Sequence, residues 1–414
     1  MAIHVLDEAN RCLQCKKPGC QKGCPISTPI PKVIALLRAG RVDEAGELLF
    51  ENNPLTTVCC RVCNHEDQCE GHCVLGRKGA PVHFSAIEEY ISDLYGSRVP
   101  DAPAEPNGMR VAIIGAGPAG LTIAVILARR GYEVTIFEDH DKIGGVLRYG
   151  IPEFRLPKTV LDEFQERHLE ANGVRLRFNT TIGSAISIDD MLEDGYRAVF
   201  AGTGVWRPHS LRIPGETLGN VHYGINYLAS PDSFSLGRHV IVIGAGNAAM
   251  DVARTALRHG VQKLECFVRS SHIAASKHER SYAELEGVEF VLNRAPVRIT
   301  EEGVVFVETT GSEVGEDGAA PTLKVLPGTE KLYPADSVII SAGQGPLDRL
   351  VSTTEGLEVS PRGLLVTDED GHTTRPEVFA CGDVASGART VVEAVAAAKR
   401  VADSMDAYMR GAGA

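Results

Sequence analysis

Nine of the eleven cysteines in this chain lie between residues 12 and 73, in spacings that are typical of metal binding. The run RCLQCKKPGCQKGCP arranges Cys12, Cys15, Cys20 and Cys24 as C-x2-C-x4-C-x3-C-P. In ferredoxins a run of this kind gives three thiolates to one iron–sulfur cluster and the last, before proline, to another. A second group follows in VCCRVCNHEDQCEGHC: Cys59, Cys60, Cys63, Cys69 and Cys73. Together they suffice for two [4Fe–4S] clusters.

Structural zinc is the alternative for this cysteine group. Zinc sites commonly use two regular C-x2-C pairs, with four ligands for each ion. The x4, x3 and x5 spacings here are irregular, and they favour two interleaved clusters. An anaerobic preparation that carries zinc and no iron would decide for zinc.

Further along the chain, a glycine-rich turn with the features of a dinucleotide site joins a strand at 110–115 to a helix at 121–130. The turn GAGPAG holds Gly115, Gly117, Pro118, Ala119 and Gly120. The first glycine permits the tight turn, the second lets backbone N–H groups approach a pyrophosphate, and the third allows close packing. Glu138 ends the next strand, 23 residues after Gly115, where a ribose-hydroxyl acceptor is expected. An ordinary glycine-rich turn is the alternative.

A second turn of this type, GAGNAA, follows a strand at 239–244. Gly244 and Gly246 have the permitted spacing, and Asn247 and Ala248 open the next helix. The following strand leads to Arg269 instead of an acid. A cation at this point can meet a 2′-phosphate, although Ser270 and Ser271 add no second charge, and Arg269 could also simply face solvent.

Two dinucleotide sites in one chain indicate a flavin and a nicotinamide, since hydride transfer needs both rings. Near the C-terminus, a strand at 378–380 leads to Gly382 and Asp383, and a helix begins near Thr390. The helix N-terminus can stabilise a reduced flavin, and Asp383 can accept a hydrogen bond from the ribityl chain. A plain turn before a surface helix is the alternative. No closely spaced cysteine pair follows residue 73, so we expect electrons to leave through the clusters.

Composition excludes several other classes of protein. The 414 residues, 43% of them hydrophobic, correspond to about two to three domains. With 42 basic against 54 acidic residues the net charge is −12, and there is no basic stripe, so nucleic acid is not an expected partner. The start MAIHVLDEANRC lacks the apolar stretch of a signal peptide, and no 18 apolar residues run together. We therefore expect a cytoplasmic protein without membrane insertion.

The elements that position these residues form two different patterns. Residues 30–52 carry apolar side chains at helical spacing, with a break at Gly40, which predicts a helical N-terminal domain around the cysteines. The stretch GSRVPDAPAEPNG at 96–108 is rich in turn formers and predicts a linker. After it, apolar strands alternate with Ala-rich helices. This alternation predicts an α/β fold with parallel sheets.

These motifs give the chain its resemblance to the glutamate synthase small-subunit family, which includes the N-terminal part of dihydropyrimidine dehydrogenase. The resemblance covers nearly the whole length and depends on the Cys12–Pro25 run, VCCRVC, GAGPAG, GGVLRYGIPEFRLPK, GAGNAAMDVARTAL and VFACGDV. It implies a helical [4Fe–4S] domain at 1–100 and an FAD-binding Rossmann-like domain at 108–236 and 333–414. An NAD(P)H-binding domain at 237–332 would be inserted in the FAD domain.

The resemblance also implies how the cysteines divide between two clusters. It assigns Cys12, Cys15, Cys20 and Cys73 to one cluster and Cys24, Cys63, Cys69 and Glu88 to the other. Glu88 could instead be a solvated helix residue, or the match could fall on Glu89. Cys59 matches a family cysteine that is usually not a ligand. Cys60 and Asn64 depart from the family, which usually has Gly and Pro there.

Further family positions concern the two nucleotides. The GIPEFRLPK loop is implied to lie beside the flavin, with Gly145, Arg155 and Lys158, or it is a double-proline turn between a strand and a helix. In the family, the crossings between the nucleotide domains and the close approach of the backbone to FAD are marked by the positions of Gly202, Thr203, Gly204, Gly343 and Gln344. NADPH-selective relatives carry Arg-Arg followed by Met-Pro-Ala. Arg269-Ser270 and Ile273-Ala274-Ala275 here favour NAD(H).

The expected activity is hydride exchange between NAD(H) or NADP(H) and FAD, with single electrons passing through two [4Fe–4S] clusters. No acid–base catalytic residue is expected, and the partner is a catalytic redox subunit. It could be a metal-dependent aldehyde, formate or hydrogen oxidoreductase, a dihydropyrimidine dehydrogenase subunit or a transhydrogenase partner. The alternatives are the small subunit of NADPH-dependent glutamate synthase and, in a different class, a redox-sensing module without turnover.

Overall fold

The computed structural model describes residues 4–96, 104–310 and 323–411, which form two compact units. One unit comprises residues 1–148, 153–205 and 345–414, and the other comprises 149–152 and 206–344. Part of the predicted linker, at residues 97–103, lies outside the described residues.

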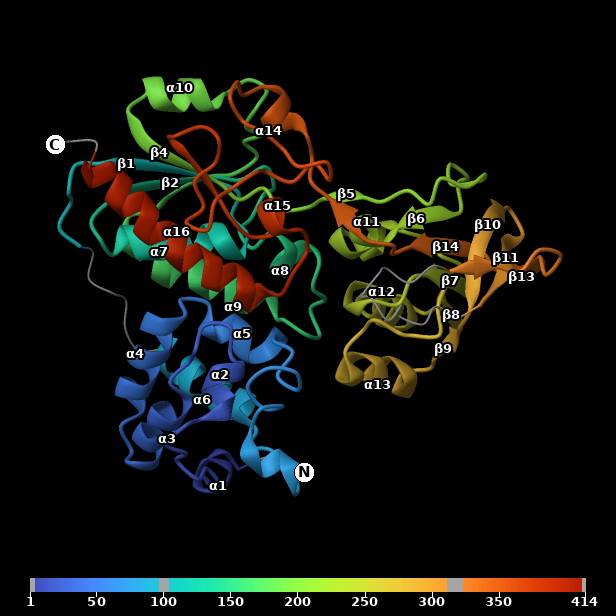
Figure 1. Cartoon of the computed structure of the whole chain (residues 1–414), viewed down its shortest axis with the longest axis horizontal. Coiled ribbons are helices and arrows are strands. Elements are labelled where there is room, and N and C mark those ends of the chain that lie inside the picture. The colour runs from blue at the N-terminus through green and yellow to red at the C-terminus, as the bar shows by residue number, and fades with distance from the viewer. Residues whose placement is uncertain (1–3, 97–103, 311–322, 412–414) are drawn as a thin grey trace. The chain divides into compact units, whose positions relative to one another are not determined.

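The N-terminal part of the first unit is helical, as predicted (Figure 1). Its elements are α1 (Val5–Asn10), α2 (Gly19–Gly23), α3 (Ile30–Arg38), α4 (Val42–Asn52), α5 (Thr56–Val62), η1 (Val74–Arg77) and α6 (Phe84–Gly96). The apolar spacing of the sequence places Val33, Leu49 and Ile87 in one fully buried core. Gly40, with a φ of +73°, separates α3 from α4 at the predicted break.

The rest of the first unit contains a parallel five-stranded sheet of order β16-β4-β1-β2-β3. Its strands are β1 (Arg110–Ile114), β2 (Glu133–Phe137), β3 (Arg175–Arg177), β4 (Tyr196–Ala201) and β16 (Val378–Ala380). The helix after the first glycine-rich turn, α7 (Pro118–Ala128), is apolar on almost every side and is buried. The long helix α16 (Val391–Gly411) packs along it (Figure 1).

Short helices complete this part of the unit. They are α8 (Val146–Tyr149), α9 (Lys158–Phe164), η2 (Gln165–Leu169), η3 (Glu170–Asn172), α10 (Ile188–Glu193), α14 (Arg349–Ser352) and α15 (Asp383–Ser386). The GIPEFRLPK segment connects α8 to α9, so a turn between a strand and a helix is wrong for it. The preceding residues 146–149 form one helical turn, because Leu147 and Arg148 N–H groups bond to the carbonyls of Gly144 and Gly145.

The second unit has its own parallel five-stranded sheet, of order β6-β14-β7-β8-β9. Its strands are β6 (Val221–Tyr223), β7 (His239–Ile243), β8 (Lys263–Phe267), β9 (Val288–Val291) and β14 (Ser337–Ile340). The helices are α11 (Gly224–Ala229), η4 (Pro231–Ser233), α12 (Asn247–Arg258) and α13 (Lys277–Leu285). An antiparallel layer contains β10 (Arg294–Thr300), β11 (Gly303–Thr310), β12 (Lys324–Val325) and β13 (Lys331–Pro334). The Phe267 and Phe306 rings stack 4.0 Å apart between sheet and layer.

This second unit is wider than the segment 237–332 expected for the nicotinamide domain. The difference arises because β6 and β14 complete its sheet on one side, so residues 206–236 and 333–344 fold with it. Two short strands, β5 (Arg207–Pro208) and β15 (Gln344–Gly345), pair where the chain enters and leaves this unit. The α/β fold with Rossmann-like parallel sheets is confirmed. No helix among the described residues is long and apolar enough to cross a bilayer.

Candidate cluster cavities and nucleotide turns

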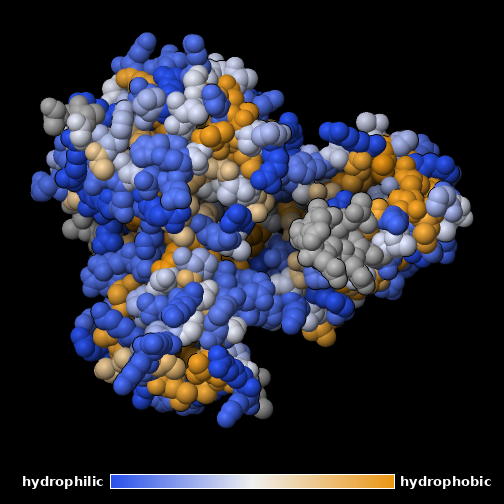
Figure 2. All heavy atoms as spheres, in the orientation of Figure 1, coloured by the Kyte–Doolittle hydropathy of each residue, from blue (hydrophilic) through white to orange (hydrophobic). Residues whose placement is uncertain are grey.

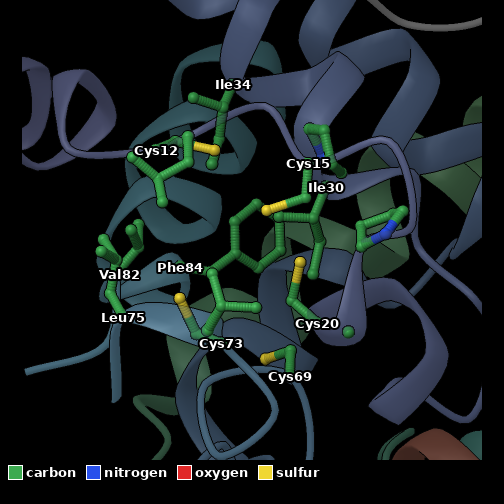
Figure 3. A pocket seen from close by; sticks show the side chains of 15 residues that line it. Cys12, Cys15, Cys20, Ile30, Ile34, Cys69, Cys73, Leu75, Val82 and Phe84 are labelled. Carbon is green, nitrogen blue, oxygen red and sulfur yellow. The ribbon is translucent and has the colours of Figure 1, made fainter. Parts of the chain in front are cut away.

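Cys69 and four further cysteines line one cavity of the helical domain, here called the first cavity (Figure 3). Cys12 and Cys15 lie in the loop after α1, Cys20 lies in α2, and Cys73 directly precedes η1. Burial, with the neighbouring Cys73 and Cys12 thiols, raises the pKa of the Cys20 thiol to about 11. The four thiols therefore lose their protons most readily when a cation, such as a cluster iron, lies between the sulfur atoms. All four cysteines are free of disulfides.

The walls of the first cavity are apolar. Ile30, Ile34 and Phe84 line it from α3 and α6, and Figure 3 shows their side chains among the thiols. Cys69 also lines this cavity. Thiolate donors in an apolar shell suit an iron–sulfur cluster, because the shell limits access of water to the metal.

A second cavity lies beside the first and shares Cys69 with it. It is lined by Cys24, Cys59, Cys63, Cys69 and Glu88. The pKa of the Cys63 thiol is raised by a hydrogen bond with Cys59 and by burial, and burial raises that of Cys69. These donors, too, are suited to a bound cation, and the cavity offers one thiol more than the family resemblance requires.

Glu88 and its neighbour Glu89 occupy different environments. The Glu88 side chain is buried, accepts a hydrogen bond from the Thr56 hydroxyl at 2.9 Å, and has a pKa raised to about 7 by burial. Glu89 is 47% exposed and forms an ion pair with Arg61 at 3.2 Å. Cys60 is also buried, and its thiol donates to the Thr57 carbonyl at 3.2 Å. Of these residues, only Glu88 lines the second cavity.

Polar groups around the second cavity were missed by the sequence analysis. Asn53 lines it, is 2% exposed, and accepts a hydrogen bond from the Leu55 N–H on its Oδ1 at 2.9 Å. Its Nδ2 is buried and has no hydrogen-bond partner among the described residues. A buried amide donor without a partner fits a cavity whose contents accept hydrogen bonds, such as cluster sulfur atoms.

A second polar connection reaches the same cavity from α16. The Thr28 hydroxyl lies 3.3 Å from the Cys24 sulfur and accepts a hydrogen bond from Asn52 Nδ2 at 3.2 Å. Lys399 of α16 donates to the Asn52 carbonyl at 2.6 Å. No spacing rule points to these residues, because they come from segments far apart in the sequence.

The first glycine-rich turn is bordered closely by other backbone. Gly115 has a φ of +98°, and a Cβ there would lie 2.6 Å from the Gly202 carbonyl oxygen. A Cβ on Gly120 would lie 2.1 Å from the Gly115 carbonyl oxygen. Pro118 is the first residue of α7, and Ala119 follows it. These positions require glycine and leave a cradle at a helix N-terminus that fits a pyrophosphate.

Two distant segments meet this turn. A Cβ on Gly145 would lie 2.9 Å from the Gly117 Cα. Gly382, with a φ of +73°, would place a Cβ 3.4 Å from that of Ala119. The structure thus brings together three of the segments expected at the flavin.

Glu138 braces the first turn. It accepts hydrogen bonds from the Ala116 N–H at 2.7 Å and from the Nδ1 of His140 at 2.8 Å. The pKa of His140 is raised to about 10 by Asp139 and Glu138. His140 was missed by the sequence analysis, and its position two residues after Glu138 was the available signal.

The segment after β16 lies at a separate cavity that also includes Pro25, Gly382 and Arg400. Asp383 lines it, and burial raises its pKa to about 6. Thr390 caps α16, because its hydroxyl oxygen accepts a hydrogen bond from the Glu393 N–H at 3.4 Å. A half-buried carboxylate at this cavity fits hydrogen bonding to ribityl hydroxyls.

Other predicted flavin positions are distributed around α8. Lys158 donates from Nζ to the Leu147 carbonyl at 2.9 Å, so this ammonium group caps α8. Arg155 is half-buried. The two cysteines outside the helical domain, Cys266 and Cys381, are buried, and burial raises the pKa of Cys381 to about 12.

The second glycine-rich turn repeats the geometry of the first. Gly244 has a φ of +130°, and a Cβ there would lie 2.2 Å from the Ser341 carbonyl oxygen. Gly246 caps α12, which opens with the exposed Asn247 and Ala248. Asn247 Oδ1 accepts from the Ser276 N–H at 2.9 Å. This turn also offers N–H groups at the start of a helix to an anion.

Arg269 is exposed at the end of β8, where it can meet a nucleotide or solvent. Gly204 and Gly343, near the chain crossings, have φ values of +67° and +98°. A Cβ on Gly343 would lie 3.2 Å from the Nδ1 of His209. The positive φ of Gly343 explains why glycine stands there, because few other residues adopt this backbone conformation.

Comparison with known proteins gives two family matches. The family described as "Pyridine nucleotide-disulphide oxidoreductase" matches residues 109–398. The family described as "Dihydropyrimidine dehydrogenase domain II, 4Fe-4S cluster" matches residues 2–98. The division falls at the segment predicted as a linker.

Individual relatives span most of the chain. The glutamate synthase [NADPH] small chain of Halomonas elongata is 36% identical over 97% of this chain and 90% of its own length. The NAD-dependent dihydropyrimidine dehydrogenase subunit PreT of Escherichia coli is 32% identical over 99% of this chain and 96% of its own. A solved structure of FprA from Mycobacterium tuberculosis in complex with NADPH has a TM-score of 0.63 at 20% identity. It covers 75% of this chain and 86% of that one, and it shares the fold.

Proposed function

We propose, from the premise that this chain belongs to the family of glutamate synthase small chains, that it is the electron-transfer subunit of a larger oxidoreductase. The proposed cofactors are FAD, NAD(H) or NADP(H), and two [4Fe–4S] clusters. When bound, the nicotinamide and flavin supply hydride transfer and the clusters supply one-electron transfer. The chain itself is an NAD(P)H-dependent oxidoreductase subunit with a flavin-type nucleotide domain and a 4Fe-4S domain.

The observation that carries the proposal is the order of the cavities within the first unit. The two cysteine cavities share Cys69, and the second is also lined by Val392 of α16. Pro25, which follows Cys24, lines the cavity that contains Asp383. The second cavity therefore adjoins the proposed flavin region, and the first cavity lies beyond it.

In this proposal each group of residues binds or positions a cofactor. Cys12, Cys15, Cys20 and Cys73 hold one cluster, and Cys24, Cys63, Cys69 and Glu88 hold the other. The flavin is surrounded by the first turn and by Glu138, Gly145, Arg155, Gly204, Gly382, Asp383, Thr390 and Gly343. Gly244, Gly246, Asn247, Ala248 and Arg269 bind the nicotinamide nucleotide. The apolar walls exclude water from the clusters.

We propose NAD(H) as the preferred nucleotide. Arg269 comes two residues after the end of β8, and the next two residues, Ser270 and Ser271, carry no charge. A 2′-phosphate clamp normally needs more than one charged or hydrogen-bonding partner. The relative PreT is described as NAD-dependent, whereas the glutamate synthase small chain is described with NADPH.

The partner is proposed to be a catalytic redox subunit such as a metal-dependent aldehyde or formate oxidoreductase or a dihydropyrimidine dehydrogenase subunit. The second candidate is the small subunit of an NADPH-dependent glutamate synthase, which the 36% identity with that chain favours. Co-purification with a glutamine-dependent large subunit would decide for the second candidate.

Anaerobic rapid mixing with NADH or NADPH tests the activity. We expect NADH to bleach the flavin absorbance, followed by reduction of iron–sulfur absorbance in the same chain. Faster bleaching by NADPH would overturn the nucleotide preference. Bound flavin that NADH does not bleach would overturn the proposed function and favour a sensing module.

A further inference from the structure

Two segments that border the first cavity carry Lys and Arg but no acidic residue. These segments, 11–24 and 71–83, supply four of its five cysteines and contain no Asp or Glu, whereas the fifth, Cys69, lies between Asp67 and Glu70. Their cations are Arg11, Lys16, Lys17, Lys22, Arg77 and Lys78. Since the whole chain has a net charge of −12, the remainder carries −12 − 6 = −18. The two segments are therefore positively charged in a chain whose net charge is negative.

Five of these six cations are available to a partner. Lys16, Lys17, Lys22, Arg77 and Lys78 are exposed, and within residues 4–96, 104–310 and 323–411 none of them forms an ion pair. Arg11 is engaged by Glu8 at 2.5 Å. Lys16 and Lys17 lie between two residues of the cavity wall, Cys15 and Pro18.

The same two segments also expose apolar side chains. Leu13 and Val74 both line the first cavity, and they are 61% and 37% exposed. Figure 2 shows orange apolar surface bordered by blue hydrophilic surface on the helical domain, at the bottom of the view. An apolar centre with a charged rim is the usual anatomy of a protein–protein interface.

The second cavity has the opposite character. Its Cys59 and Glu88 are buried, and Val392 of α16 also lines it. The first cavity is thus the one whose wall reaches the surface through exposed residues. A redox partner has to bring its own centre close to a cluster, and exposed residues of the cavity wall allow such a contact here.

We propose that the face formed by Leu13, Val74 and the five exposed cations docks an acidic redox protein, a partner with carboxylates around its own electron-transfer centre. The proposal rests on the proposed function and adds the place and charge of the partner contact. Complementary charge would speed encounter and orient the partner, while the apolar pair would contact its centre. Segments 11–24 and 71–83 contain no aromatic residue, which argues against single-stranded nucleic acid, whose bases stack on aromatic rings.

Two small redox proteins of opposite charge test this directly. Plant plastocyanin is acidic and mitochondrial cytochrome c is basic, and both accept single electrons. With the anaerobic holoprotein, one NADH delivers two electrons and reduces two acceptor molecules, releasing NAD⁺ and a proton. Binding is measured separately by titration calorimetry with each acceptor. We expect plastocyanin to bind and react at least tenfold better than cytochrome c at low ionic strength, with the difference lost in high salt.

Charge-reversal variants locate the face. Lys16→Glu/Lys17→Glu should lower plastocyanin binding and its reduction rate at least tenfold. The matched control Arg175→Glu/Arg197→Glu makes the same charge change on exposed residues of β3 and β4 and should change both less than twofold. Reduction of the neutral acceptor benzoquinone should be unchanged in both variants. If Lys16→Glu/Lys17→Glu loses iron or unfolds, Lys22→Glu/Lys78→Glu takes its place.

Equal effects of the two charge reversals would overturn the proposal, as would equal binding of the two acceptors. Stronger binding to a DNA oligonucleotide or to anionic vesicles than to plastocyanin would overturn it in favour of another anionic partner. Failure of the proposed function is a separate result, because NADH would then fail to bleach the flavin or to reduce the clusters before any acceptor is added.

Discussion

The two cysteine cavities share a wall but differ in donors, burial and surroundings. The first has five thiols, including the shared Cys69, and apolar walls, and the segments 11–24 and 71–83 that supply four of these thiols are positively charged. The second has four thiols and the buried Glu88, with Asn53 and Thr28 at its edge and α16 beside it. One cavity is suited to a partner outside the chain and the other to the flavin region within it. Cysteine groups with similar spacings therefore line two cavities with different surroundings.

The largest expected effect separates ligands from bystander cysteines. Cys20→Ala should remove one cluster and about half of the bound iron, from about eight to about four atoms per chain. Cys60→Ala should leave the iron unchanged, because the Cys60 thiol is bonded to the Thr57 carbonyl. Iron and acid-labile sulfide analysis of anaerobic preparations measures both. An equal loss in both variants would contradict the assignment of the first cavity.

The next effect concerns the fifth donor of the second cavity. Glu88→Ala should lose or degrade one cluster, whereas Glu88→Gln keeps an oxygen donor and should retain it. Glu89→Ala should retain it because Glu89 points to solvent. Cys59→Ala is the decisive comparison. Retention of iron in Cys59→Ala supports Glu88 as ligand, while loss there and retention in Glu88→Ala would make Cys59 the ligand.

A smaller effect is expected from Asn53, which lies only at the second cavity. Asn53→Asp keeps the acceptor for the Leu55 N–H but replaces the unpartnered Nδ2 donor with an oxygen. Loss of a donor disfavours the more negative, reduced cluster. We expect a roughly tenfold drop in the reduced-to-oxidised ratio at a fixed potential, about 59 mV for one electron.

The Asn53 effect should appear in only one of the two clusters. EPR-monitored redox titration resolves them, and the first-cavity signal is the internal control. A shift in both signals, or a shift to higher potential, would contradict the role of this amide.

The smallest effect concerns the contact between α16 and the helical domain. Lys399→Met removes the hydrogen bond to the Asn52 carbonyl and should lower the free energy of unfolding by about 1 kcal/mol. Lys142→Met, at a half-exposed lysine with a 3.9 Å contact to Asp162, is the control and should have less effect. Denaturant unfolding measures the difference. Equal destabilisation by both variants would show that the α16 contact contributes little.

The sequence analysis identified the cysteines that line the two cavities because ligand spacing is a local property of the chain, whereas Glu88 and the division of the cysteines into two sets were implied by the family resemblance. The same holds for the two glycine-rich turns, where strand, glycine spacing and helix follow one another directly. Asn53, Thr28 and Lys399 were not predicted, since their roles depend on contacts between distant segments. One side of the second sheet was also missed, because β6 and β14 lie outside the segment with the clear βαβ pattern.

The most direct test of the central claim is an EPR-monitored redox titration of the anaerobically purified chain. We predict two [4Fe–4S] signals with different midpoint potentials, integrating to about two spins per chain. A single signal of about one spin per chain would contradict the claim that the two cavities hold separate clusters. Stoichiometric zinc with no cluster signal would contradict it completely.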